Sequence, residues 1–398
     1  MHNLGFNHNI LKSGYSPTVA LGDDIRKLTR QGIEVFPLHT GDPDFDTPEI
    51  IKASISKALF DGHNHYSDSQ GLLVFRTAIC KEIKRIKDLE YKAQEILVTI
   101  GAIHAYFLSL KTLLNQGDEI IVLTPSWPTH VKLAEVLGII VHEVGGTLET
   151  GFIPDIHSIE EKVTNKTKAI VINYPSNPTG ALPNKEFLQE LTDLCLKKRL
   201  YIISDEVYET ILDENVRMEY PSAISESAKT ITISINSFSK SHSLTGHRVG
   251  YVAADAKVIK QLKKVSQFSI TNAPTFIQKG LSDVIGLSQT HESCSTMVSK
   301  YQERNLLVDE LLKSSDRPIA YKKPKGGFYY FIQPSFKHIN VEVYCQKLLK
   351  KTSVVMVPGN VYGSSGNQFI RMTFAASNHQ IKEGITRFLE FHNSNISL

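Results

Sequence analysis

Short apolar runs alternate with amphipathic stretches between residues 95 and 254, and this alternation limits the fold more than any other feature. The runs are continuous enough to be buried strands; they span Glu95–Gly101, Glu119–Pro125, Ile139–Val144, Lys168–Tyr174, Leu200–Glu206, Thr230–Asn236 and Arg248–Ala254. Helical patterns lie between them, as at His104–Asn115, Thr129–Gly138 and Asn184–Arg199. Strands that alternate with helices predict an α/β fold, in which helices cover both faces of a mostly parallel seven-stranded sheet.

The pattern changes after about residue 290. A long helix is predicted over Ser293–Leu312 and a final helix over Asn378–His392. Three short strands are predicted between them, at Gly326–Phe331, Ser353–Val357 and Phe369–Thr373. Strands and helices that are not regularly interleaved favour a smaller α+β domain.

We therefore expect an N-terminal arm that contributes to the small domain (1–45), a large ligand-binding domain (46–290) and a small C-terminal domain (291–398). The net charge of +3 is too small to indicate binding to nucleic acid. No apolar stretch approaches the ~18 residues of a membrane span. The four cysteines lie far apart without zinc spacing, so no metal site is expected. The first residues lack a secretory signal, and we expect a cytoplasmic protein.

The run Ser237-Phe238-Ser239-Lys240, with Arg248 eight residues later, is the most informative motif for function. A lysine amine can form a Schiff base with an aldehyde. The hydroxyls of Ser237 and Ser239 and the guanidinium of Arg248 can hold a phosphate dianion. A solvated lysine in a polar turn is the alternative explanation for such a run.

Three polar residues follow predicted strands, where parallel sheets bind their ligands. Asp205 could keep a pyridine nitrogen protonated, or it could cap a helix or form an ion pair. Tyr208 could donate to a ring hydroxyl, or it could pack in the core. Asn177, in an Asn-Pro-Thr-Gly turn, could also bond a phenolate oxygen.

Four further residues are candidates for the same site. The backbone N–H groups of Ala102 and Ile103 begin a predicted helix, so they could bind an anion. Trp127, the only tryptophan, could stack on an aromatic ring or lie in the core. Arg371 stands in an apolar strand, where it could bind a substrate carboxylate or form an internal salt bridge.

These motifs in this order resemble the class I/II aminotransferase family, which are pyridoxal-phosphate enzymes of fold type I. The resemblance covers nearly the whole chain. It rests on the lysine motif and on four further segments, Gly41-Asp42-Pro43-Asp44-Phe45-Asp46-Thr47-Pro48, His65-Tyr66-Ser67-Asp68-Ser69-Gln70-Gly71, Asn177-Pro178-Thr179-Gly180 and Ser204-Asp205-Glu206-Val207-Tyr208.

The resemblance implies that Lys240 binds pyridoxal 5′-phosphate as a Schiff base and then moves the α-proton of an L-amino acid. It implies that the other cofactor contacts come from Ala102, Ile103, Trp127, Asn177, Asp205, Tyr208, Ser237, Ser239 and Arg248. Tyr66 would reach the phosphate of a second protomer, so a homodimer with a shared active site is implied. Arg371, Asn177 and the Gly41 backbone would bind the substrate α-carboxylate.

His39 departs from the family pattern, because many members have a small residue at this position. An imidazole there would lie near the substrate end of the cofactor, as an acid/base or hydrogen-bonding group. A packed or solvent-facing histidine is the alternative. A histidine before this loop is also similar to a small branch of the family, the oxygen-using arginine oxidases and hydroxylases.

Four functions follow. The leading interpretation is an aminotransferase that uses an L-amino acid and a 2-oxo acid with ping-pong kinetics. The second is an oxidase or hydroxylase of L-arginine or a similar amino acid, with O₂ as co-substrate, and the third is a carbon–sulfur β-lyase. A non-catalytic DNA-binding sensor is disfavoured, because the aminotransferase resemblance begins too near the first residue for a preceding DNA-binding module.

Overall fold

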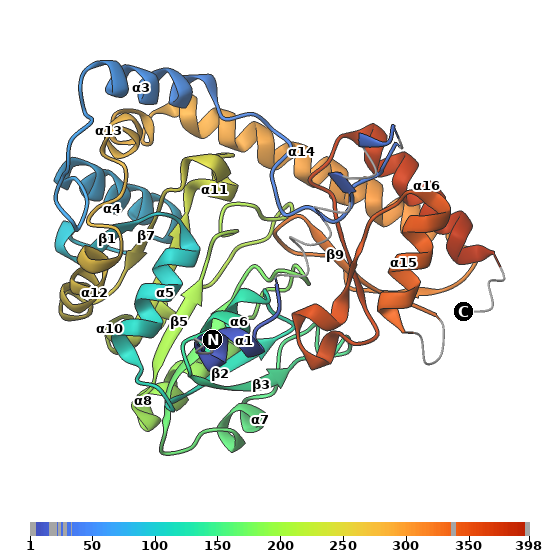
Figure 1. The fold of residues 1–398 in the computed structure, drawn as a ribbon, viewed down its shortest axis with the longest axis horizontal. Coiled ribbons are helices and arrows are strands. Elements are labelled where there is room, and N and C mark those ends of the chain that lie inside the picture. The colour runs from blue at the N-terminus through green and yellow to red at the C-terminus, as the bar shows by residue number, and fades with distance from the viewer. Residues whose placement is uncertain are drawn as a thin grey trace.

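The chain forms two β-sheets with helices packed around them (Figure 1). The computed structural model describes residues 5–15, 22, 25–26, 30–32, 34–335 and 340–394. The larger sheet has seven strands and the smaller has four. The predicted α/β class, with a mostly parallel seven-stranded sheet, is therefore confirmed.

All seven predicted strands are present in the larger sheet, with ends within two residues of the prediction. They are β1 (Ile96–Thr99), β2 (Glu119–Thr124), β3 (Ile140–Gly145), β4 (Thr167–Asn173), β5 (Tyr201–Asp205), β6 (Thr232–Ser237) and β7 (Gly250–Ala253). Their order across the sheet is β1-β7-β6-β5-β4-β2-β3. Only β7 runs antiparallel to its neighbours, so the other six strands end at the same edge of the sheet.

Both faces of this sheet are buried, which explains why its strands are apolar throughout. In β2, Ile120 and Val122 face one hydrophobic cluster, while Ile121 and Leu123 face another. The first cluster is covered by α5 (Ala102–Leu113), α6 (Thr129–Val136) and α12 (Ala256–Ser269). The opposite face is covered by α3 (Glu49–Phe60), α4 (Leu73–Lys87), α7 (Ile156–Glu161), α8 (Lys185–Lys198) and α13 (Thr275–Val284).

The smaller sheet is antiparallel, with the order β10-β11-β9-β8. Its strands are β8 (Ile319–Ala320), β9 (Tyr329–Pro334), β10 (Val357–Pro358) and β11 (Ile370–Thr373). The main helices around it are α14 (Ser288–Lys313), α15 (Val341–Thr352) and α16 (Asn378–Asn393). The short elements elsewhere are α1 (His8–Lys12), α9 (Pro221–Ile224), α10 (Glu226–Ile231), α11 (Phe238–Ser241) and the 3₁₀ turns Ala93–Glu95, Thr245–His247, Gly359–Tyr362 and Ser364–Gly366.

Two of the predicted C-terminal strands differ from the structure. The strand predicted over Ser353–Val357 is wrong for most of its length, because Ser353 takes a left-handed conformation that ends α15. Only Val357 of that run belongs to a strand. The strand predicted from Gly326 begins instead at Tyr329, because Gly327 has a φ of +70° and forms a turn. The final helix and the strand at Phe369–Thr373 are confirmed within one residue.

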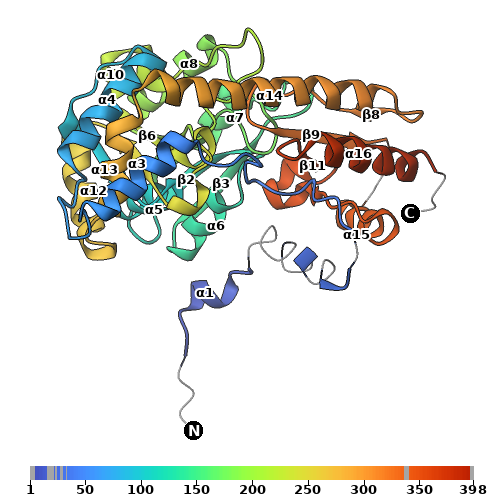
Figure 2. The ribbon, with the colours of Figure 1, turned by 90° about the horizontal axis from the view of Figure 1, so that it is seen from above.

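Two segments connect the two sheets. Helix α14 runs from the helices of the larger sheet to those of the smaller one (Figure 2). The segment after Glu34 joins the smaller sheet, where Phe36 pairs with Val354 and Thr373 donates its backbone N–H to Leu38. The three-part division at residues 45 and 290 stays a prediction. Among the described helices, none has the length and apolar character that a membrane crossing requires.

Candidate active site

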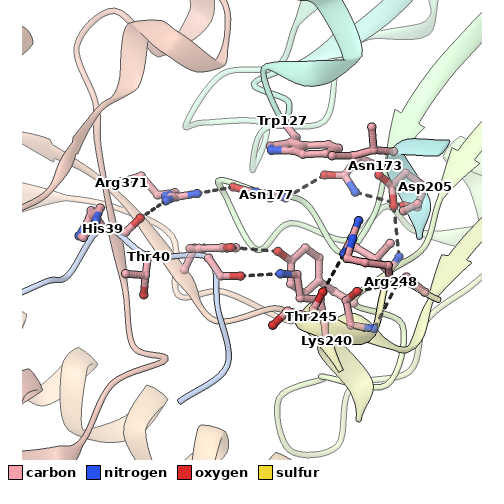
Figure 3. A pocket seen from close by; sticks show the side chains of 18 residues that line it. His39, Thr40, Trp127, Asn173, Asn177, Asp205, Lys240, Thr245, Arg248 and Arg371 are labelled. Carbon is pink, nitrogen blue, oxygen red and sulfur yellow. Dashed lines mark hydrogen bonds between the residues drawn. The ribbon is translucent and has the colours of Figure 1, made fainter. Parts of the chain in front are cut away.

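A cavity of about 380 Å³ lies at the edge where the parallel strands of the larger sheet end (Figure 3). The smaller sheet and the loop at Gly41 close its other side. The cavity brings together all but one of the predicted site residues: His39, Gly41, Ala102, Ile103, Trp127, Asn177, Asp205, Tyr208, Ser237, Ser239, Lys240, Arg248 and Arg371. The exception is Tyr66, which lies on the surface with 87% of its area exposed.

Lys240 lies in α11, immediately after β6, and its side chain enters the cavity. Its Nζ donates to the carbonyl oxygen of Gly41 at 2.6 Å, so the lysine links the larger sheet to the N-terminal loop. Burial, assisted by the positive charges of Arg248 and Arg371, lowers the pKa of Lys240 to about 8. A larger fraction of this amine is therefore neutral and nucleophilic near pH 7 than of an ordinary lysine.

Asp205 is the last residue of β5, and its carboxylate is supported from behind. Oδ2 lies 3.0 Å from Nε2 of His130. The other ring nitrogen of His130 lies 2.8 Å from the hydroxyl of Ser126, so the imidazole is fixed at both ends. Trp127 packs edge-on against the same imidazole, at 5.5 Å between ring centroids. The buried carboxylate and the indole therefore form one rigid wall of the cavity.

Next to Asp205, the cavity is built to hold an anion. Gly101, with a φ of +97°, turns the chain from β1 into α5, whose first N–H groups belong to Ala102 and Ile103. A Cβ at Gly101 would lie 2.9 Å from Nη2 of Arg248, so glycine leaves room for the guanidinium. Ser237 and Ser239 add two hydroxyls that lie 2.9 Å apart. A helix N-terminus, hydroxyls and a guanidinium are suited to bind phosphate.

Arg371 lies on β11 and is 3% exposed. Its Nη1 donates to Oδ1 of Asn177 at 3.0 Å, and its Nη2 donates to the backbone oxygen of His39. Its Nε has no hydrogen-bond partner among the residues that the structure describes. A buried guanidinium with donor capacity to spare can bind a carboxylate.

His39 lies beside Arg371, and its side chain is also buried. Burial, followed by the positive charge of Arg371, lowers the pKa of His39 to about 4. The imidazole is therefore neutral near pH 7. Its Nδ1 has no hydrogen-bond partner within the described ranges of the chain.

Three residues that the sequence does not single out support the cavity through hydrogen bonds: Asn173, His130 and Tyr329. Thr40, Val207 and Thr245 also line the cavity and were not predicted. Asn173 ends β4 and donates to the backbone oxygen of Asp205 at 3.1 Å, and its position after a strand could have identified it. His130 follows Trp127 by three residues, but nothing in that spacing indicates a contact with Asp205. The hydroxyl of Tyr329 lies 2.9 Å from that of Tyr208, although 121 residues separate them.

These residues fit pyridoxal 5′-phosphate. The cavity volume lies within the usual range of cofactor pockets, about 300–1,000 Å³. A cradle for the phosphate, a carboxylate for the ring nitrogen and a lysine for the aldehyde lie around one space. Gly250 is also required next to this cradle, because a Cβ there would lie 2.6 Å from the backbone oxygen of Asn236. No group of three or more His, Cys, Asp or Glu side chains in the described ranges could hold a metal ion.

Comparisons with known proteins agree with this geometry. The family model for aminotransferase class I and II matches residues 33–388. The probable aspartate/prephenate aminotransferase of Aquifex aeolicus is 34% identical over 94% of each chain. The crystal structure of aspartate aminotransferase from Thermotoga maritima superposes with a TM-score of 0.90, at 31% identity, over 98% of this chain and 100% of that one. The aromatic aminotransferase from Pyrococcus horikoshii superposes with a TM-score of 0.86, at 31% identity, over 92% and 98% of the two chains.

Proposed function

The chain belongs to the class I and II aminotransferase family, and we propose that its cavity binds an L-amino acid by the α-carboxylate at Arg371 and moves the α-proton with Lys240. Members of this family use pyridoxal 5′-phosphate, and the protein is a pyridoxal-phosphate-dependent aminotransferase. When bound, this cofactor accepts the electron pair that the α-carbon releases. The observation that carries the assignment of residues is the half-buried Lys240 amine, which lies between the anion cradle and Arg371 in one cavity.

Lys240 has two tasks. Its amine anchors the cofactor, for which a neutral nitrogen is required, and the lowered pKa supplies one. With a substrate bound, the same Nζ would take the α-proton and hold it for return to the product. A pKa of about 8 is closer to neutral pH than that of an ordinary lysine, which suits both taking and giving a proton.

Asp205 would keep the ring nitrogen of the cofactor protonated, and His130 supports the Asp205 carboxylate from behind. A carboxylate facing the ring nitrogen favours the protonated ring, which withdraws electrons more strongly. His130 bonds the other side of that carboxylate, so Asp205 cannot rotate away from the ring. Trp127 provides an apolar surface on which the ring can stack.

Arg371 and Asn177 orient the substrate. Their 3.0 Å hydrogen bond fixes the guanidinium, whose free donor capacity then points at the α-carboxylate. The amino group of the substrate is thereby held toward Lys240. When the covalent bond between the α-carbon and its hydrogen is correctly oriented, Lys240 can remove that proton selectively.

We expect an uncharged or cationic substrate side chain rather than a second carboxylate. Among the described lining residues of a single protomer the cations are Lys240, Arg248 and Arg371, and each already has a task. Besides Asn177 and Tyr329, which contact Arg371, the surface at this end of the cavity includes His39, Thr40 and Gly41. Relatives are named for aspartate and for aromatic substrates, so the two classes can be tested directly.

A homodimer would complete the site through Tyr66. This side chain is 87% exposed in the single protomer, and Phe268, on α12, is 93% exposed. Their segments lie together, because Asn272 bonds Ser67 and Thr275 bonds the backbone of His65. Exposed aromatic groups on adjoining segments are typical of an interface. Analytical ultracentrifugation should give a dimer for the wild type and a monomer for Phe268→Asp.

The experiment that tests the function follows the visible spectrum of the holoenzyme with single L-amino acids and no 2-oxo acid. An aminotransferase completes one half-reaction, and its spectrum changes once. A 2-oxo acid then restores the original spectrum. No spectral change with any of the protein amino acids would contradict the proposal. Preference for L-aspartate over neutral and basic amino acids would contradict the side-chain assignment alone.

His39 favours a second candidate, an enzyme that passes substrate electrons to O₂. The imidazole is buried and neutral, and its Nδ1 has no hydrogen-bond partner in the part of the chain that the structure describes, so it could hold or move a proton at the substrate end. An oxygen electrode distinguishes the two functions, since an oxidase consumes O₂ with L-arginine or a similar amino acid and needs no 2-oxo acid. Under this candidate His39→Asn should abolish O₂ uptake. No uptake by the wild type with any L-amino acid would exclude it.

A further inference from the structure

Tyr329 joins the two sides of the cavity through its hydroxyl. It begins β9 in the smaller sheet, is 1% exposed and lines the cavity. The hydroxyl lies 2.9 Å from that of Tyr208, which follows β5 of the larger sheet. The two rings meet edge to face at 5.8 Å between centroids. Tyr329 is thus in direct contact with Tyr208, to which the resemblance to the aminotransferase family assigns a contact with the ring oxygen of the cofactor.

The same ring carries the substrate-binding cation on its face. The guanidinium carbon of Arg371 lies 4.3 Å from the ring centroid of Tyr329, a cation–π contact. A Cβ at Gly41 would lie 2.7 Å from the Tyr329 hydroxyl, so the Gly41 loop is packed closely against it. Lys240 bonds the carbonyl of that same glycine. Tyr329 therefore touches Tyr208, Arg371 and the loop that receives Lys240.

The direction of the hydrogen bond follows from counting protons. Burial raises the pKa of both phenols, so both keep their single proton across the ordinary pH range. If Tyr208 donates its proton into the cavity, it has none for Tyr329, and Tyr329 must be the donor of the pair. The positive charge of Arg371 over the ring makes Tyr329 a better donor. Because Tyr208 accepts this hydrogen bond from Tyr329, its own donation into the cavity becomes stronger.

We propose that Tyr329 is a positioning residue that sets how strongly Tyr208 donates to the ring oxygen of the cofactor. This inference rests on the proposed function, because it requires the cofactor to lie against Tyr208. Charged groups that face the tyrosine pair come from four places: Arg371 on β11, Asp42 in the N-terminal loop, Asp205 on β5 and Lys240 on α11. None of these changes in a variant that removes only the Tyr329 hydroxyl.

The test is a spectrophotometric pH titration of the holoenzyme, which gives the midpoint at which the lysine-bound cofactor gains its proton. The deprotonated form carries an uncompensated negative ring oxygen, and donation from Tyr208 favours that form. Tyr329→Phe weakens this donation and should raise the midpoint by roughly half a pH unit, within the range of a single lost hydrogen bond. The apoenzyme of Tyr329→Phe should also bind added pyridoxal phosphate more weakly than the wild-type apoenzyme does. 3-Fluorotyrosine at position 329, a stronger donor of unchanged shape, should move the midpoint the other way.

The control is Tyr330→Phe. The Tyr330 hydroxyl bonds Asn305 on α14, and neither residue lines the cavity. Loss of this hydroxyl should therefore leave the midpoint unchanged. If the wild type titrates and both Tyr329→Phe and the fluorotyrosine variant have the same midpoint as the wild type, the inference is overturned. The proposed function then stays intact. A wild type that binds no pyridoxal phosphate would overturn the proposed function itself. If Tyr329→Phe does not fold, the fluorotyrosine variant alone decides through the sign of its shift.

Discussion

The two ends of the cavity are built in different ways. The cofactor end consists of residues at the end of the larger sheet: Ala102, Asp205, Ser237, Ser239 and Arg248. The substrate end consists of His39, Gly41, Asn177, Tyr329 and Arg371, which come from four separate stretches of the chain. The cofactor end is rigid because one sheet positions it. The substrate end exists only where the N-terminal loop, the Asn177 turn and the smaller sheet meet.

This difference suggests that substrate choice can change without loss of the cofactor site. The Arg371 bonds to Asn177 and His39 cross between segments, whereas Ser237 and Ser239 bond within one turn. Movement of the smaller sheet relative to the larger one would therefore alter the substrate end first. Variants that affect one end and spare the other are the direct way to test this separation.

Lys240→Ala should have the largest effect, because Lys240 serves both ends. Removal of a general acid/base costs about 10²–10⁴-fold in rate, and we expect at least ~10³-fold lower turnover. The measurement is the rate of the half-reaction, with and without added methylamine, which should restore part of it. Lys257→Ala, at an exposed position on α12, is the control and should retain full activity. Full turnover in Lys240→Ala would contradict the mechanism.

Arg371→Lys should damage the substrate end alone. Lysine keeps the positive charge but lacks the planar guanidinium, whose several donors can bond Asn177 and the α-carboxylate at the same time. We expect kcat/KM for the amino acid to fall by about 10²-fold, equivalent to ~3 kcal/mol. Cofactor affinity, measured by titration of the apoenzyme, should be unchanged. An equal loss of cofactor affinity would show that the two ends are not separable.

Arg248→Ala should have the converse effect. A hydrogen bond to a charged group contributes about 1.5–3 kcal/mol, so the cofactor should bind roughly 10- to 100-fold more weakly. At saturating cofactor, the KM for the amino acid should match that of the wild type. The visible band of the bound cofactor reports occupancy in the same cuvette. A raised KM at full occupancy would mean that Arg248 also acts on the substrate end.

The sequence predicted residues at both ends of the cavity, but only the cofactor end could be placed by the order of its strands, for a physical reason. Parallel strands all end at one edge, so residues that follow β4, β5 and β6 must meet there, and their order along the chain is enough to place them. Tyr329 meets Tyr208 only because the smaller sheet folds back over the larger one, which no local pattern encodes. The apolar run after Ser353 predicts a strand from this residue, but its left-handed conformation ends α15 instead.

The smallest expected effect concerns His39 and the stability of the substrate end in acid. The folded pKa of about 4 lies below the ordinary value of 6.5, so the unfolded chain binds the proton more readily. His39 makes its full contribution to the free energy of unfolding above pH 6.5, and this contribution is lost as the pH falls toward 4. At pH 5 the free energy of unfolding is lower by about 2 kcal/mol. His39→Asn should therefore be less destabilised than the wild type between pH 7 and pH 5 in urea titrations. The control His157→Gln, at an exposed position, should follow the wild type. If His39→Asn loses as much stability as the wild type over this interval, His39 is not buried as a neutral imidazole, and the substrate end is open to water.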